Sequence, residues 1–303
     1  MMESNPKFKS GFVSLVGRPN TGKSSLINAL MGKKVAITSN TAQTTRHRFR
    51  AIYDEDEAQI IFVDTPGLHK PHDVLGDQLN KSALKALEDT DVCAFCLDAS
   101  MEFGRGDEWV LKHLAGIDAF KLLVITKADL VDERIIQSQI DKASNALEFD
   151  SVCVVSAKEE LGIESLIDVL KAALPLGPRW FPEGTTTDQE PEILIAEFIR
   201  EKILYLTKDE VPHSVGVVVD DMSYSYKKNL SSISATIFVE RDSQKGIIIG
   251  KQGSLIKQIG IQAREDLEHM LGNKVFLDLR VKVKKDWRRD ASQIQRFGYG
   301  EGL

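Results

Sequence analysis

The stretch that decides the fold is Gly17-Arg18-Pro19-Asn20-Thr21-Gly22-Lys23-Ser24, which continues into Ser25. It follows the apolar run Phe12–Val16 directly, so we place it between a strand and a helix. The glycines let backbone amides curl around a phosphate, and the N-terminus of the helix adds partial positive charge. The pattern predicts a phosphate-binding loop in which Lys23 spans the β- and γ-phosphates and Ser24 ligates Mg²⁺.

Outward from this loop, short apolar runs alternate with amphipathic stretches as far as about Leu174. The further runs are Ile60–Val63, Val92–Leu97, Leu122–Ile125 and Val152–Val155. Apolar residues recur at helical spacing in Leu75–Leu87, Glu108–Leu114 and Ile135–Leu147. This alternation predicts an α/β fold, a mostly parallel sheet with helices on both faces. The short motifs follow the runs, at the sheet edge where ligands bind in such folds.

The second motif is Asp64-Thr65-Pro66-Gly67-Leu68, at the end of an apolar run. Taken alone, this motif is as often a plain turn as a functional segment. After a phosphate loop, we interpret Asp64 as a carboxylate that holds Mg²⁺ through water, and the Gly67 amide as a contact to the γ-phosphate. Thr44 or Thr45 can supply a hydroxyl that reaches Mg²⁺ only in the triphosphate state, and spacing does not choose between them.

The third and fourth motifs are Thr126-Lys127-Ala128-Asp129 and Ser156-Ala157-Lys158. The Asp129 carboxylate can accept two hydrogen bonds from guanine, whereas adenine leaves it unpaired at a cost of about 1–3 kcal/mol. The stem of Lys127 can lie along the base, and the amide of Ala157 can meet guanine O6. Together with the phosphate loop, these motifs predict a guanine-nucleotide pocket.

The chain has 303 residues, which is more than one hydrophobic core usually serves, and we expect two domains. No apolar run is long enough to cross a bilayer, and Met1–Lys9 lacks the apolar stretch of a signal peptide. We therefore expect a cytoplasmic protein. Cys93 and Cys96 are spaced like a metal or redox pair, but within a buried strand this spacing puts the thiols on opposite faces, so we interpret them as core residues.

The net charge of −6 is unevenly distributed. Residues 241–290 hold twelve Lys or Arg against seven Asp or Glu, and residues 1–240 carry −11. A basic C-terminal segment in an acidic chain suggests a polyanionic partner for that segment, although solvated surface charge is the alternative. The aperiodic stretch from residue 175 to 191 is rich in Pro, Gly and Thr, and we place domains at 1–177 and 192–303, with a linker at 178–191.

The second domain contains Gly250-Lys251-Gln252-Gly253 between the apolar run Ile247–Ile249 and a helix beginning near Ser254. We expect the other elements to be a helix at Ile193–Leu206 and strands at Val215–Val219, Ser232–Glu240 and Val275–Val283. A Gly-x-x-Gly loop in this setting is typical of KH domains, where it clamps about four nucleotides. Its element order looks like the type II KH arrangement. Possible RNA contacts outside the loop are Lys257, Lys284, Lys285, Arg288 and a stacking Trp287, although a solvated strand end is an equal reading for the last four.

These motifs resemble those of the translation-factor-related GTPases, and most closely the Era family. The resemblance spans essentially the whole chain and includes Gln43-Thr44-Thr45-Arg46-His47-Arg48 and Asp64-Thr65-Pro66-Gly67-Leu68-His69. It implies a Ras-like G domain with a type II KH domain, GTP hydrolysis with Mg²⁺, and binding to the 3′ end of small-subunit ribosomal RNA. It further implies a monomer that acts in 30S subunit assembly and associates peripherally with the inner face of the cell membrane.

Family patterns favour Thr45 as the Mg²⁺ ligand. His47 and His69 lie in the predicted switch segments, where an exposed loop histidine is more often a bystander than a catalytic group. Two residues depart from common patterns: Thr126 replaces the usual Asn, which ties the base loop to the phosphate loop, and Leu68 occupies the place of a water-orienting Gln. We therefore expect retained guanine selectivity and slow turnover. The resemblance to related GTPases also implies that Asn20 helps to hold a catalytic K⁺ ion. The alternative is that Asn20 only shapes the turn of the loop.

Two other functions are compatible with parts of the chain. A phosphate-loop ATPase or kinase with an RNA-binding appendage would not need the Thr126–Asp129 motif. A passive KH-type RNA-binding protein would not need Lys23.

Overall fold

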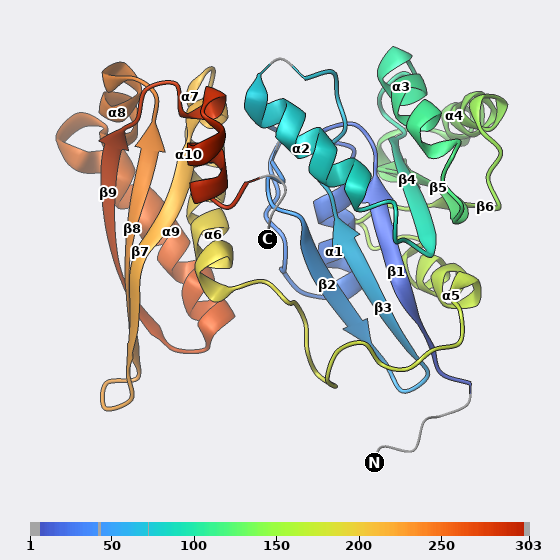
Figure 1. Ribbon diagram of the computed structural model, residues 1–303, viewed down its shortest axis with the longest axis horizontal. Helices are drawn as coiled ribbons and strands as arrows, with labels where there is room; N and C mark the ends of the chain where they lie inside the picture. The colour runs from blue at the N-terminus through green and yellow to red at the C-terminus, as the bar shows by residue number, and fades with distance from the viewer. Residues whose placement is uncertain (1–6, 42–43, 72, 300–303) are drawn as a thin grey trace. The chain divides into compact units, whose positions relative to one another are not determined.

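The computed structural model describes residues 7–41, 44–71 and 73–299 (Figure 1). The chain forms two compact units, divided in the main between Asp188 and Gln189. The short segments Ser39–Thr41 and Asp73–Leu75 group with the second unit. Gln43, part of the family motif, lies outside the described residues.

The first unit is built on a six-stranded sheet with the order β2-β3-β1-β4-β5-β6. Its strands are β1 (Lys9–Val16), β2 (Phe49–Asp54), β3 (Ala58–Asp64), β4 (Val92–Asp98), β5 (Phe120–Thr126) and β6 (Ser151–Val154). All neighbours pair in parallel except β2 with β3. The α/β prediction is confirmed, and each of the five apolar runs is a strand. The antiparallel edge strand β2 was missed, because the charged residues Arg50 and Asp54 leave only a short apolar sequence between them.

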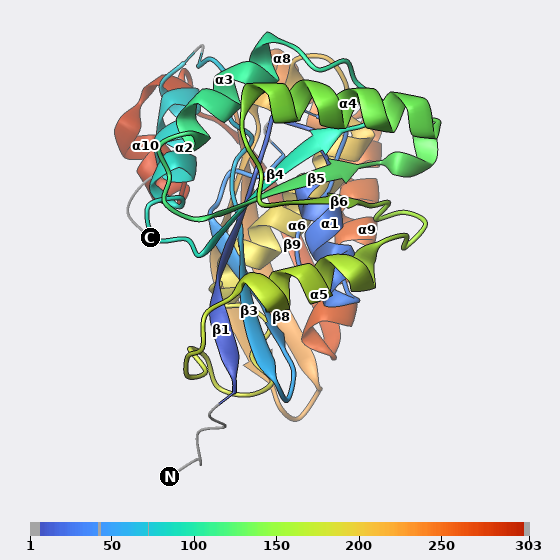
Figure 2. The ribbon, with the colours of Figure 1, turned by 90° about the vertical axis from the view of Figure 1, so that its right-hand side faces the viewer.

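Helices cover both faces of this sheet, as predicted. On one face lie α1 (Lys23–Met31) and α5 (Ile163–Ala173), and on the other α2 (Val74–Lys85), α3 (Arg105–Leu114) and α4 (Glu133–Ala146). Figure 2 shows α4 and α5 on opposite sides of the strands. Among the described residues, no helix combines the length and apolar character needed to cross a membrane.

The two cysteines of β4 lie on opposite faces of the sheet, as their spacing predicts. Cys96 packs in the core beneath α1 and α5, and Cys93 packs in the core beneath α2, α3 and α4. Burial raises the pKa of each thiol to about 12, so both are protonated at neutral pH. Within the described ranges no cluster of His, Cys, Asp and Glu could hold a metal ion by itself. The two thiols are core residues.

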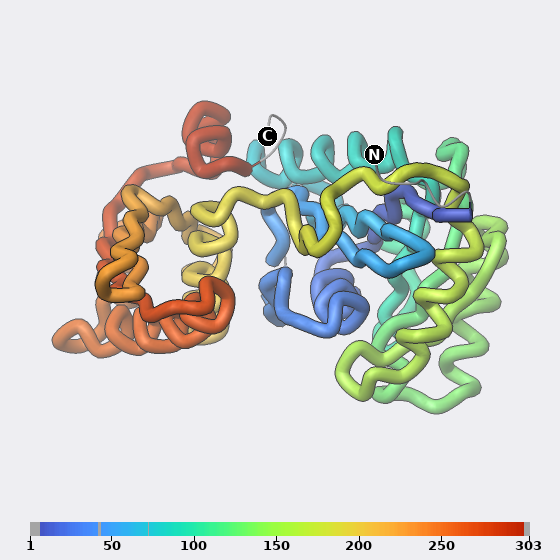
Figure 3. The backbone as a smooth tube through the Cα atoms, turned by 90° about the horizontal axis from the view of Figure 1, so that it is seen from below, coloured from blue at the N-terminus to red at the C-terminus, as the bar shows by residue number. Residues whose placement is uncertain are grey.

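The segment predicted as a linker is held against the first unit over most of its length, beside the β2–β3 hairpin (Figure 3). Arg179 pairs with Asp54 at 3.0 Å, and the Gln59 side chain accepts hydrogen bonds from the amides of Trp180 and Phe181 at 2.8 and 3.0 Å. Polar side chains on the hairpin therefore give a segment without periodicity a fixed course.

The second unit is built on a three-stranded sheet. In chain order its elements are α6 (Pro191–Leu206), α7 (Val211–Ser214), β7 (Gly216–Ser225), β8 (Leu230–Val239), α8 (Asp242–Ile249), η2 (Lys251–Gly253), α9 (Ser254–Leu271), β9 (Lys274–Val283), η3 (Trp287–Arg289) and α10 (Ala291–Arg296). Strand β8 pairs antiparallel with β7 and parallel with β9. Helices α6 and α9 bury one face of this sheet in a single apolar core.

Helix α8 differs from the expectation. Ile247–Ile249 is the last turn of this helix and not a separate extended run. The helix begins where the Gln244 side chain accepts hydrogen bonds from the amides of Glu240 and Arg241 at 2.9 and 3.0 Å. Three consecutive isoleucines favour a strand by propensity, but the capping interaction and the burial of Ile248 stabilise the helical turn.

Candidate functional site

The loop between β1 and α1 curls around the ammonium group of Lys23. A Cβ at Gly17 would lie 2.5 Å from the carbonyl oxygen of Cys96, and Gly22 opens α1 with a left-handed φ of 88°. Only glycine fits the first position without a shift of backbone. Lys23 Nζ donates to the carbonyls of Arg18 at 2.8 Å and Gly17 at 3.3 Å. Burial lowers the pKa of this buried lysine, and the nearby Asp64 opposes that effect. The cation is thus held within the curl of the loop, where a phosphate would neutralise it.

The three predicted Mg²⁺ residues converge, although they come from α1, β3 and the segment between α1 and β2. Ser24 Oγ lies 2.9 Å from Thr45 Oγ1 and 2.9 Å from Asp64 Oδ2, and Thr45 Oγ1 lies 3.2 Å from the same carboxylate oxygen. The structure brings Thr45, and not Thr44, into this hydroxyl–carboxylate group. The chain therefore places side-chain oxygens of the type that Mg²⁺ prefers beside the phosphate loop.

Asp64 carries two signs that it fits a cation. Its Oδ1 atom is buried and makes no hydrogen bond to any described residue. Burial raises its pKa to about 6, and Lys23 and the hydroxyls of Ser24 and Thr45 oppose that rise. A buried carboxylate with an unused oxygen gains the most from a nearby divalent ion.

The loop after β3 is packed against the phosphate loop. A Cβ at Gly67 would lie 2.6 Å from the nitrogen and Cα of Pro19, so this contact requires glycine. The amide of Leu68 donates to the carbonyl of Gly17 at 3.0 Å, while its side chain is fully buried in the core beneath α2 and α3. Leu68 therefore faces away from any attacking water. Thr65 donates to the carbonyl of Leu15 at 2.7 Å and fixes the strand end; the following Pro66 is buried.

The two histidines occupy structured positions. His69 Nδ1 lies 3.0 Å from the carbonyl oxygen of Gly67, and the Asn80 side chain binds the His69 backbone on both sides, at 3.3 and 2.6 Å. His47 is buried. The contacts of His69 hold the loop after β3 in place.

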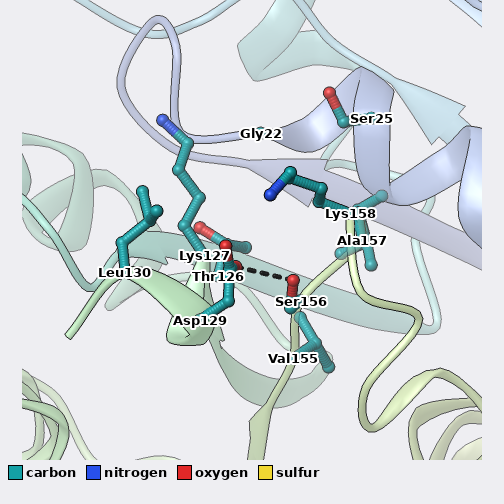
Figure 4. A pocket seen from close by; sticks show the side chains of 11 residues that line it. Gly22, Ser25, Thr126, Lys127, Asp129, Leu130, Val155, Ser156, Ala157 and Lys158 are labelled. Atoms are coloured by element: carbon teal, nitrogen blue, oxygen red, sulfur yellow. Dashed lines mark hydrogen bonds between the residues drawn. The ribbon is translucent and has the colours of Figure 1, made fainter. Parts of the chain in front are cut away.

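A pocket of about 180 Å³ lies beside the phosphate loop, where a base would sit (Figure 4). Its lining comes from the predicted motifs together with α1 and the turn after β5. The lining residues are Gly22, Ser25, Leu26, Thr126, Lys127, Asp129, Leu130, Val155, Ser156, Ala157 and Lys158. Ser156 Oγ donates to Asp129 Oδ1 at 2.6 Å, which orients the carboxylate. The two base motifs are therefore joined by a hydrogen bond within one cavity.

Thr126 connects the base loop to the phosphate loop, although it replaces the Asn that usually makes this connection. Its hydroxyl oxygen lies 2.7 Å from the carbonyl of Thr21 in the phosphate loop and 3.2 Å from the carbonyl of Leu97. A hydroxyl has one proton and can donate fully to only one of these carbonyls, whereas an Asn amide has two. The base loop is tied to the phosphate loop, with one donor fewer than an Asn would supply.

The sequence reasoning missed Leu26, Leu130 and Val155, which line the pocket, and Asp98, which contacts it through Lys127. Asp98, the last residue of β4, binds Lys127 Nζ through Oδ2 at 2.6 Å. Its signal was available, because Asp98 ends an apolar run in the same way as Asp64 does. Leu26 is buried in α1, and Leu130 is exposed at the rim; as apolar residues near a motif they carry no distinctive signal.

Arg18 contributes to the phosphate loop through its backbone, while its side chain contacts α3. Its guanidinium pairs with the fully buried Asp107 of α3 at 2.9 Å, so only its carbonyl, which binds Lys23, belongs to the site. Burial raises the pKa of Asp107, and the adjacent Arg18 favours its ionised form. Asn20 adopts a left-handed φ of 65° and offers its carbonyl oxygen to Lys127 at 2.9 Å.

The Gly-x-x-Gly loop of the second unit is an exposed turn between α8 and α9. Gly250 has a φ of 71°, and a Cβ there would lie 2.8 Å from the amide nitrogen of Leu255. Gly253 has a φ of 78°, and Gln252 is also left-handed at 52°. The side chains of Lys251 and Gln252, and of Lys257 one turn into α9, are exposed. The loop therefore presents cations beside a backbone that a strand of nucleic acid can approach closely.

One predicted RNA contact, the stacking of Trp287, is wrong, and a second, Arg288, stays a prediction. Trp287 is completely buried: its Nε1 donates to the carbonyl of Ser214 at 2.9 Å, and its ring packs against Phe297 and Tyr299. It cannot stack on a base. Arg288 is half-buried and paired with Glu240 at 2.8 Å.

The basic residues before this tryptophan are differently placed. Lys285 is exposed, whereas Lys284 is half-buried and extends the sheet through its amide, which donates to the carbonyl of Val239 at 2.7 Å. The charge run is therefore only in part available to a ligand.

Comparison with known proteins matches both units. A family model described as "50S ribosome-binding GTPase" matches residues 12–127, and a KH-domain model matches residues 210–288. The solved structure of a variant of Era from Aquifex aeolicus bound to GDP·AlF4⁻ is 38% identical, covers 97% of this chain and 100% of its own, and has a TM-score of 0.93. Era in complex with MgGDPNP and nucleotides 1506–1542 of 16S ribosomal RNA is also 38% identical, covers 97% and 99%, and has a TM-score of 0.93.

Proposed function

Because this chain belongs to the Era family, and is thus a GTPase with a C-terminal KH domain, we propose that it is a GTP-dependent switch that binds the 3′ end of small-subunit ribosomal RNA. We place its action in assembly of the 30S subunit. The observation that carries the switch is the convergence of Thr45 and Asp64 on Ser24. Two loops on either side of the β2–β3 hairpin meet there at the phosphate loop.

Bound Mg²⁺ would neutralise phosphate charge at this point, held by Ser24 and Thr45 directly and by Asp64 through water. The chain's own residues then respond to the terminal phosphate. Thr45 and the Gly67 amide hold their loops in place while that phosphate is present, and its loss releases them. Leu68 is buried and cannot orient water, so intrinsic turnover is slow.

The RNA partner is supported by the Gly250–Gly253 loop and by the solved Era complex with 16S ribosomal RNA. Crosslinking and sequencing of bound RNA, with GTP and with GDP, tests it. We expect crosslinks at the 3′ end of the small-subunit RNA. Recovery of unrelated RNA with equal efficiency would contradict the proposal.

A matched pair of variants makes this test specific. Lys251→Asp with Gln252→Asp reverses the charge of the loop while keeping both glycines, and aspartate tolerates the left-handed position of Gln252. Lys142→Asp with Ser138→Asp changes the charge by the same amount at exposed positions on α4 of the first unit. Only the loop variant should lose the crosslinks.

The two alternative functions differ from this proposal in measurable ways. Membership of a GTPase family rules out the ATPase and kinase reading, and unlabelled ATP should not displace GTP from the pocket. A passive RNA-binding role predicts RNA affinity that ignores the nucleotide. The proposed switch predicts affinity that depends on it.

We also propose a K⁺ ion at Asn20, supported by the resemblance and by the exposed, left-handed position of this residue beside the phosphates. GTP turnover should fall several-fold when K⁺ is replaced by Na⁺. Asn20→Gly removes the side chain without backbone strain, because glycine adopts positive φ freely. This variant should turn over GTP equally in both salts, whereas equal rates in the unmodified protein would contradict the proposal.

The proposed setting is the cytoplasm, with a monomer that associates peripherally with the inner face of the membrane. The resemblance to the family supports this setting. Sedimentation velocity should show a single species near 33.7 kDa, and co-sedimentation with anionic lipid vesicles should be reversed by salt. A dimer would contradict the proposed monomer. Absence of vesicle binding at low salt would contradict the proposed association with the membrane.

A further inference from the structure

Asp98 and Lys127 form an ion pair at the wall of the base pocket. Asp98 is 3% exposed and ends β4, directly beside Thr126 in the β4–β5 ladder. Its Oδ2 accepts from Lys127 Nζ at 2.6 Å. Its Oδ1 accepts from both the amide and the hydroxyl of Ser100, at 2.9 and 2.6 Å. Both oxygens have partners, so the orientation of the carboxylate is fixed before any ligand arrives.

Lys127 joins three segments of the nucleotide site through one side chain. Its own backbone lies in the base loop, with a left-handed φ of 55°. Its ammonium reaches the carbonyl of Asn20 in the phosphate loop at 2.9 Å, and Asp98 at the end of β4. The stem passes over the phosphate loop, where Cε would lie 3.8 Å from a Cβ at Gly22. A base in the pocket would lie beside this stem.

We propose that Asp98 is a positioning residue for guanine-nucleotide affinity, acting through Lys127. A lysine stem has several rotatable bonds, and ordering it on binding costs conformational entropy. Asp98 holds the stem in place before the nucleotide binds. Nucleotide binding therefore does not have to offset the entropy lost in ordering the stem. The ion pair is short and half-shielded from water, because Lys127 is 37% exposed and Asp98 is buried. Solvent screening therefore leaves part of its strength intact.

The test is a double-mutant cycle on GDP affinity with Asp98→Asn and Lys127→Met. Asparagine keeps the acceptor for Ser100 but turns an amide donor toward the ammonium, and methionine keeps an apolar stem without the charge. In the unmodified background, Asp98→Asn should weaken GDP binding about tenfold, equivalent to about 1.4 kcal/mol. In the Lys127→Met background it should change binding less than twofold. Equal losses in the two backgrounds would overturn the proposal, because they would show that Asp98 acts independently of Lys127.

Kinetics distinguish positioning from loss of structure. Asp98→Asn should raise KM for GTP and the GDP dissociation rate far more than it lowers kcat. If Asp98→Asn fails to fold, Ser100→Ala removes one of the hydrogen bonds that orient the carboxylate and should weaken GDP binding about twofold, again only when Lys127 is present. A loss of the same size with Met at position 127 would overturn the proposal.

The inference rests on the assignment of this pocket to the guanine base, and a separate variant tests that assignment. Asp129→Ala should abolish the preference for guanine over adenine nucleotides. If that preference survives, the assignment of the pocket fails. If it is lost while the Asp98–Lys127 cycle is additive, only the positioning role fails.

Discussion

The nucleotide site of the first unit and the RNA-binding segment of the second were inferred from motifs of very different kinds. In the first unit, the residues that matter are held by buried contacts: Lys23 by two carbonyls, and Ser24 and Thr45 by the Asp64 carboxylate. In the second unit Lys251 and Gln252 are exposed between Gly250 and Gly253, and Lys251 projects from a backbone set by glycine. The residues of the first site contact one another within the fold, whereas the second site is an exposed surface.

The difference teaches what each kind of sequence signal measures. A Gly or Lys in a fixed pattern after a strand reports backbone geometry, which the fold then enforces. A run of basic and aromatic residues reports only composition. The run after β9 contains the exposed Lys285 but also the fully buried Trp287 and the paired Arg288.

The largest expected effect is on stability, and it distinguishes a buried tryptophan from an exposed one. Trp287→Ala should destabilise the second unit by about 3–5 kcal/mol, because it removes a fully buried ring and leaves the Ser214 carbonyl without its donor. Trp180→Ala is the control: this ring is 59% exposed, and only its edge contact with Phe12 is lost, for about 1 kcal/mol or less. Urea unfolding followed by circular dichroism measures both. A Trp287→Ala variant with unchanged stability would show that this ring is a surface residue after all.

The next effect tests the pre-assembled site. Lys23→Ala should weaken GDP binding by about 3 kcal/mol, roughly a hundredfold, because charge-assisted contacts to phosphate are lost. Lys33→Ala, at an exposed position just past α1, should bind normally. Fluorescent-GDP titration provides the measurement. Comparable losses in the two variants would mean that the effect is one of general charge.

A smaller effect is expected at the exposed loop. Lys251→Ala and Lys257→Ala should each weaken RNA binding several-fold and lower the slope of log affinity against log salt by about one. Neither should alter GDP affinity. Filter binding at several salt concentrations gives both quantities. An unchanged salt slope would show that these lysines do not meet phosphates.

The smallest effect concerns the residue that departs from the family pattern. Thr126→Val removes the hydroxyl that binds the Thr21 carbonyl and should weaken GDP binding by about 1 kcal/mol. Thr126→Asn supplies a second donor for the Leu97 carbonyl and should strengthen binding by a few-fold at most. Isothermal titration of GDP tests the order Asn, Thr, Val. A different order would show that this position works through shape and not through hydrogen bonding.

Much of the fold was predictable, since apolar runs identify buried strands whatever their neighbours. The sequence did not reveal β2, a short edge strand that contains the charged residues Arg50 and Asp54, or α8, where a Gln244 cap stabilises a helix containing three isoleucines. In the nucleotide site, the motif residues were predictable from the sequence. Asp98 was also predictable, because it stands at the end of an apolar run. The pairing of Arg18 with Asp107 and the burial of Trp287 depend on residues far along the chain, which local patterns do not reach.

The central claim is that the state of the first unit's nucleotide sets the affinity of the second unit for RNA. The most direct measurement is the affinity of the full chain for an RNA ending in the 3′ sequence of small-subunit ribosomal RNA, with GDPNP, with GDP and without nucleotide. Coupling of about 1–3 kcal/mol predicts binding at least about fivefold tighter with GDPNP. The same affinity in all three conditions would contradict the claim, even if GTP hydrolysis and RNA binding were each intact.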